Sequence, residues 1–175
     1  MVAQRSGMGE NSGDIMDNNK TSALLEYFAH RHSKPSVTVL MKLCYLTDLI
    51  AIKRLGHSIT NYEYERYTFG PFNKKIYTDL EVLVSESKLE IDIDYPTYGT
   101  DSEVVLYRHK GELDDIIKLM VADEVEVADE VLSTLSGYGA RQLTQVAYQT
   151  KPMIAIGATL GGSENLGAKL NLSLK

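Results

Sequence analysis

The spacing of apolar residues predicts two helices in the first third of the chain. Between residues 20 and 32, apolar side chains recur every three or four positions, which is typical of one buried helix face. Residues 36–55 are apolar on nearly every side, apart from a narrow polar stripe that contains Lys42. They predict a central, mostly buried helix that ends at Gly56. Asp48 projects into the apolar side of this helix. Because a buried carboxylate needs partners, we expect Asp48 to hydrogen-bond a neighbouring loop.

A change to alternating spacing predicts a small antiparallel sheet in the middle of the chain. Apolar and acidic side chains alternate from Leu89, and a second strand-like run follows a turn. Together these runs predict a hairpin over about residues 89–109. Residues 64–69 form another strand-like run, which could join the hairpin as a third strand. Gly70 and Pro71 then interrupt this run before the next helix.

Helical spacing returns along the rest of the chain, and the expected fold class is α+β, mostly helical, with a single domain over residues 20–175. Residues 1–19 carry small polar residues without periodicity, which predicts a disordered leader. Thr60 and Glu63 match a helix-capping box and predict one helical turn. The stretch after Pro152 is rich in glycine, and no element is predicted there. The further predicted helices cover residues 73–87, 113–120, 128–135 and 140–149.

Composition and charge argue against several classes of protein. The net charge of −6 and an isoelectric point of about 5.2 disfavour a general attraction to nucleic acid or to an anionic membrane. Cys44 is the single cysteine and lies in the apolar helix, so we interpret it as a core residue rather than a nucleophile. No signal peptide or membrane span is apparent, which predicts a cytoplasmic protein. The four histidines lack metal-ligand spacing and no catalytic motif is present, so we expect no catalytic residue, metal or cofactor.

Two patterns suggest a surface for another protein. Five tyrosines and two phenylalanines lie between residues 45 and 77, where core packing and a recognition surface both remain open as interpretations. Residues 112–130 hold eight acids and one lysine, an acidic face that suits a basic partner. The candidate partner-binding residues from these two patterns are Tyr62, Tyr64, Asp123, Glu124 and Glu126.

The runs "VLMKLCYLTDL", "GHSIT" and "YERYTFGPFNKKIYTDL" resemble the Panacea domain, also called SocA-like or phage-associated GepA-like. The helix "ARQLTQVAYQTKPM" is similar to the closing segment of that family, although Tyr148 stands where histidine is usual and Met153 where tryptophan is usual. The resemblance covers about residues 20–153. The positions that carry its first block are Lys42, Leu43, Tyr45, Asp48, Gly56, Ile59, Thr60, Tyr67, Gly70 and Pro71.

The resemblance implies an antitoxin that is not an enzyme. Members of the family look like proteins that bind a cognate toxin directly, which points to the product of a neighbouring gene as the partner. One branch resembles an adaptor that delivers its toxin to a ClpXP-type protease. The motif residues Lys42, Tyr45, Asp48, Tyr67, Gly70 and Pro71 are then structural or partner-binding. A transcriptional regulator that binds nucleic acid, and an enzyme that uses Asp48 with a tyrosine, remain as alternatives.

Overall fold

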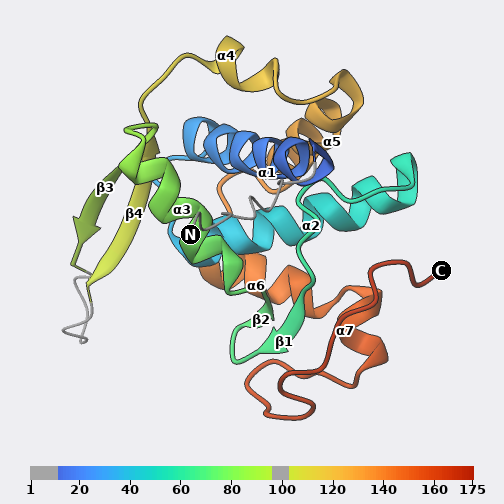
Figure 1. Cartoon of the computed structure of the whole chain (residues 1–175). Coiled ribbons are helices and arrows are strands. Elements are labelled where there is room, and N and C mark those ends of the chain that lie inside the picture. Colours follow the sequence, from blue (N-terminus) through green and yellow to red (C-terminus); the bar gives the residue numbers. More distant parts are fainter. Residues whose placement is uncertain (1–11, 96–102) are drawn as a thin grey trace, which may run out of the picture.

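Helices dominate the chain, and two short hairpins lie at its periphery (Figure 1). The computed structural model describes residues 12–95 and 103–175. The helices are α1 (Ser12–Arg31), α2 (Val37–Leu55), α3 (Lys75–Ser85), α4 (Leu113–Ile117), α5 (Ala122–Thr134), α6 (Ala140–Tyr148) and α7 (Lys151–Ala155). The strands are β1 (Glu65–Tyr67), β2 (Gly70–Phe72), β3 (Leu89–Asp94) and β4 (Val104–His109). This arrangement confirms the expected α+β class with helices in the majority.

Helix α2 is the centre of the core, as its apolar pattern predicts. It packs against α1, α5 and α6, and most of its residues from Val39 to Asp48 are buried. The Ser36 hydroxyl accepts a hydrogen bond from the Val39 backbone N–H at 3.4 Å and starts the helix. Gly56 ends it with a φ of 79°, a left-handed conformation in which glycine carries no steric penalty.

Helix α1 begins at Ser12, so residues 12–19 are helical rather than part of a disordered leader. Apart from Ile15, whose burial the structure leaves undescribed, residues 12–19 are exposed, and an exposed helical turn needs no apolar spacing in its sequence. That is why the sequence pattern begins only near Lys20. Residues 1–11, the remainder of the expected leader, lie outside the described residues.

The two hairpins form separate sheets, so the expected third strand of the β3–β4 hairpin is wrong. Strand β1 pairs antiparallel with β2, and Tyr67 lies opposite Gly70. Gly70 and Pro71 therefore belong to a strand instead of interrupting one. Gly70 has a φ of 93°, which lets the chain turn back immediately after Phe69. The β3–β4 hairpin pairs Leu89 with His109, which confirms its predicted position.

The loop between α2 and β1 contains no helical turn, so the predicted capping box is wrong. The Thr60 hydroxyl accepts from the Tyr62 backbone N–H at 3.0 Å and donates to the Asp48 carboxylate. Its side chain is thus committed to a contact with α2, and Glu63 remains exposed. The Thr60 hydroxyl therefore binds Asp48 on α2 instead of capping a local helical turn.

The C-terminal segment runs back along β1, an arrangement that the sequence did not reveal. The Arg66 backbone N–H donates to Ala168 O at 2.8 Å, and Gly167 N–H donates to Arg66 O at 2.7 Å. The segment also covers the Arg66 side chain, which is fully buried. Its Nη2 donates to the backbone carbonyls of Thr159 at 3.2 Å and Gly162 at 2.8 Å. Residues after Pro152 therefore stabilise the first hairpin.

Candidate functional site

Asp48 anchors the loop between α2 and β1 through its buried carboxylate. Its Oδ1 accepts from the backbone N–H groups of Ile59 at 2.8 Å and Thr60 at 3.1 Å. Its Oδ2 accepts from the hydroxyls of Thr60 and Tyr64. Burial raises the pKa of Asp48, while each of these hydrogen bonds acts in the opposite direction. The expected hydrogen bonding to a neighbouring loop is confirmed, and the carboxylate is fully buried.

Tyr62 and Tyr64, which the sequence suggested as partner-binding residues, are buried and leave little side-chain surface for a partner. Tyr62 is 6% exposed and Tyr64 is 1% exposed. The Tyr62 hydroxyl donates to Asp79 Oδ2 and the Tyr64 hydroxyl donates to Asp48 Oδ2, so both polar ends are satisfied inside the chain. Tyr45 is likewise buried, and its hydroxyl lies 2.7 Å from Thr150 Oγ1 at the start of α7. These tyrosines hold the core together.

Lys42 is buried as well, although its stripe on α2 predicted a polar surface. It is 3% exposed because the β1–β2 hairpin covers this side of the helix. Its Nζ donates to the Pro71 carbonyl at 2.9 Å and so fixes the hairpin to α2. Burial lowers the pKa of the Lys42 ammonium to about 8.

Gly70 brings the hairpin into direct contact with two helices. A Cβ at this position would lie 3.3 Å from Tyr148 Cε2, which requires a small adjustment, and 3.5 Å from Lys42 Cε, which is an ordinary contact. The Tyr148 ring on α6 fills the space below the hairpin, and the Arg66 guanidinium lies 5.8 Å from its centre. Tyr148 therefore supports the hairpin from the position where the resemblance leads one to expect histidine.

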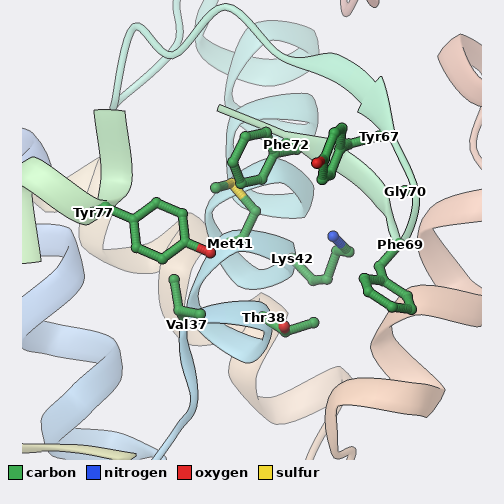
Figure 2. Close-up of a pocket in the computed structure, with 9 residues that line it drawn as sticks. All are labelled: Val37, Thr38, Met41, Lys42, Tyr67, Phe69, Gly70, Phe72 and Tyr77. Atoms are coloured by element: carbon green, nitrogen blue, oxygen red, sulfur yellow. The ribbon is translucent and has the colours of Figure 1, made fainter. Parts of the chain in front are cut away.

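A groove of about 470 Å³ opens between the first half of α2, the β1–β2 hairpin and the start of α3 (Figure 2). Its walls are aromatic: Tyr67 and Phe72 have ring centres 5.0 Å apart, and Phe72 and Tyr77 have theirs 6.1 Å apart. Tyr67 is 52%, Phe69 67% and Tyr77 47% exposed. Of the nine described residues that line the groove, Lys42 alone is charged. The lining residues are Val37, Thr38, Met41, Lys42, Tyr67, Phe69, Gly70, Phe72 and Tyr77.

Phe69 separates this groove from a second hollow of about 570 Å³. Thr38 and Phe69 line both spaces, and the second is completed by α6 and the C-terminal segment, with Arg141, Gln145 and Leu160 among its residues. The Phe69 side chain projects from the hairpin turn (Figure 2). A large aromatic residue in a two-residue turn is unusual, and this was the sequence signal that could have located the site.

The acidic residues of 112–130 lie away from the groove and are only partly free. Figure 1 shows α4 and α5 at the opposite side of α1 and α2 from the β1–β2 hairpin. Glu124 is fully buried, and its Oε1 accepts from Lys20 at 2.8 Å and from His57 at 3.0 Å. Burial would raise the pKa of Glu124, but these hydrogen bonds lower it overall. Glu124 is structural, whereas Asp123 and Glu126 are exposed.

The described residues offer little for catalysis. Within residues 12–95 and 103–175, no three His, Cys, Asp or Glu side chains gather as metal ligands would. Cys44 is buried, and burial raises the pKa of its thiol, which opposes thiolate chemistry. No helix in the described part of the chain has the length and apolarity needed to span a membrane.

The sequence-predicted residues thus fall into three groups. Lys42, Tyr67 and Gly70 line the groove, and Pro71 lies directly behind it. The buried anchors of the core are Tyr45, Asp48, Tyr62 and Tyr64. The residues on α5, remote from the groove, are Asp123, Glu124 and Glu126.

Comparison with known families concerns most of the chain. Residues 40–152 match the family model described as the antitoxin SocA-like, Panacea domain. No curated protein and no solved structure matches the chain. The matched region runs from the first turn of α2 through α6 to the beginning of α7, and so contains the hairpin and most of the groove. Because the match spans well over half of the 175 residues, the chain belongs to the antitoxin SocA-like, Panacea domain family.

Proposed function

We propose that the protein is a cytoplasmic antitoxin that neutralises a cognate toxin by direct binding, and that the aromatic groove is its docking surface. Membership of the antitoxin family supports the role. The observation that supports the surface is the exposure of Tyr67, Phe69 and Tyr77 around one groove. Large exposed aromatic side chains that gather in one place are typical of protein-binding sites.

The groove is suited to tight binding because its walls are already in place. Tyr67, Phe72 and Tyr77 pack against one another, so they lose little conformational freedom when a partner binds. The buried contact from Lys42 to Pro71 holds the hairpin that carries two of these rings. In this proposal the buried residues of the family motif build the scaffold, and the exposed aromatic residues Tyr67, Phe69 and Tyr77 bind the toxin.

Co-expression with the product of the neighbouring gene tests the proposal. That product should arrest growth alone, and the antitoxin should restore growth and co-purify with it. Phe69→Ala and Tyr77→Ala should each weaken the complex by about 30-fold, since a central aromatic anchor contributes about 2 kcal/mol. Tyr95→Ala, which removes a tyrosine that is 66% exposed and does not line the groove, is the matched control and should bind normally.

Two results would overturn the proposal. A neighbouring product that is harmless alone, or one that never co-purifies, removes the antitoxin function. Normal binding by both groove variants moves the docking surface elsewhere. The thermal unfolding midpoint of each variant should equal that of the unmodified protein, because exposed side chains contribute little to stability.

The role of a protease is a separate question within the same proposal. A ClpXP-type adaptor would form the complex in cells without the protease but protect growth only in its presence. A direct inhibitor would protect growth in both strains. Growth rescue in matched strains with and without the protease therefore assigns one of the two mechanisms.

A further inference from the structure

We infer that the partner segment which enters the groove presents a carboxylate beside an aromatic or large aliphatic side chain, and that Lys42 Nζ receives the carboxylate. This inference rests on the proposed function for the identity of the partner. Its chemical content, however, concerns the groove alone. It follows from the positive charge of Lys42 in the groove and from the mostly apolar and aromatic residues that surround Lys42.

The Lys42 ammonium lacks a counter-ion among the described residues. An ammonium group has three N–H donors, and Lys42 Nζ donates a hydrogen bond to the neutral Pro71 carbonyl. Burial is the sole cause behind its lowered pKa, with no contribution from an acid in the described part of the chain. By contrast, the buried carboxylate of Glu124 is paired with Lys20 and His57. Lys42 therefore retains the capacity to bind an anion.

The position of Lys42 directs this capacity into the groove. Figure 2 shows its side chain crossing the floor from α2, with Nζ ending between Tyr67 and Phe69. The rest of the groove is uncharged and mostly apolar or aromatic, and in Figure 2 Met41 and Phe72 appear between Lys42 and Tyr77. A carboxylate that enters beside Phe69 reaches the ammonium, while a neighbouring apolar side chain fills the space toward Tyr77.

The chemistry of the groove favours a carboxylate over a phosphate. Phosphate sites usually combine several cations or backbone N–H groups, because the group carries close to two charges. Here one buried lysine lies among neutral residues. A single negative charge next to an apolar group matches both features. The carboxylate can come from an Asp or Glu side chain or from the C-terminus of the partner.

Small probes test the groove without the toxin. We would titrate 3-phenylpropionate and its uncharged amide, 3-phenylpropionamide, into the full chain and follow NMR chemical shifts. The acid should bind in the millimolar range, as expected for a ligand of this size. It should shift the signals of Thr38, Met41 and Phe69, and bind at least fivefold more tightly than the amide. Above about pH 8 this preference should fall as Lys42 loses its proton.

Variants of Lys42 separate its charge from its structural contact. Lys42→Met keeps the aliphatic stem and removes the ammonium, so acid and amide should bind equally. Lys42→Arg keeps a positive charge and should retain the preference, which covers the case in which Lys42→Met does not fold. Equal binding of acid and amide to the unmodified protein, or shifts confined to other surfaces, would overturn the inference.

Tiled peptides of the neighbouring gene product distinguish the sources of the carboxylate. Loss of binding on Glu→Gln or Asp→Asn replacement identifies a side chain, and loss on C-terminal amidation identifies the chain end. If the full neighbouring product binds at the groove but prefers no acidic peptide, this inference fails and the proposed function stands. If the probes show the preference and the neighbouring product does not bind at all, the proposed function fails instead.

Discussion

Lys42, Tyr45 and Asp48 are spaced by three residues on α2, and each holds a different segment of the chain. A step of three residues turns an α-helix by about 300°, so successive side chains are offset by about 60°. Lys42 contacts Pro71 in the hairpin, Tyr45 contacts Thr150 before α7, and Asp48 contacts the loop before β1. The spacing of the motif therefore distributes three anchors around one side of the central helix.

Replacement of Asp48 tests this anchoring at a single residue. Asp48→Asn keeps the shape of the side chain but replaces one carboxylate oxygen with an N–H₂ group. That group cannot accept the hydrogen bonds that the carboxylate accepts from the loop and from Tyr64. We expect the free energy of unfolding to fall by about 1–3 kcal/mol. Asp94→Asn, at an exposed position in β3, is the matched control and should change stability by less than about 0.5 kcal/mol. Urea denaturation measures both; equal midpoints would argue against the anchor.

Lys42 should make stability depend on pH in the alkaline range. Its pKa falls from 10.5 to about 8 on folding, so between these values the unfolded chain binds a proton that the folded chain does not. Stability therefore rises with pH through this window. Relative to Lys42→Met, the unmodified protein should gain about 1–2 kcal/mol between about pH 7.5 and 9.5. A difference between the two proteins that stays constant over this range would contradict the buried ammonium.

At the scale of elements, the C-terminal segment is the least expected support of the groove. Removal of residues 158–175 would expose the outer edge of β1 and leave the buried Arg66 guanidinium without the carbonyls of Thr159 and Gly162. We expect a loss of at least about 3 kcal/mol, which thermal unfolding by circular dichroism would measure. Removal of residues 173–175, which are exposed, should leave the midpoint unchanged. Similar midpoints for all three chains would show that the segment is dispensable.

The sequence predicted those elements whose apolar spacing reflects their own burial. Helix α2 and the β3–β4 hairpin were found because each pattern is local. The start of α1 at Ser12 was missed because exposed helical turns carry no apolar pattern. The burial of Lys42 was missed for another reason, since the hairpin that covers it lies 29 residues further along the chain. The groove combines three elements, and its position depends on such long-range contacts.

At the scale of the whole molecule, α5, which carries the exposed acids, and the β1–β2 hairpin, which forms one wall of the groove, lie on different sides of α2 (Figure 1). The combined change Asp123→Asn with Glu126→Gln should therefore act on partner binding only through the long-range field. At low salt the association rate of this double variant should differ from that of the unmodified protein. Near 0.15 M salt, where the Debye length is about 8 Å, the two rates should agree within about twofold. The dissociation rate should not change. Stopped-flow kinetics measures both rates, with Phe69→Ala as the comparison because it should speed dissociation. Faster dissociation of the double variant would show that the acids contact the partner.

The pairing of β1 with residues 167–170 also determines when the groove is ready during synthesis. Tyr64 and Arg66 bind backbone groups that lie about a hundred positions later in the chain. Translation at about 5–20 residues per second adds those positions several seconds after the hairpin has left the ribosome. Until then, the hairpin lacks its outer neighbour and Arg66 lacks its cover. A nascent chain consequently cannot present the finished groove, and each molecule becomes competent for its partner only after residues 167–170 have left the ribosome and paired with β1.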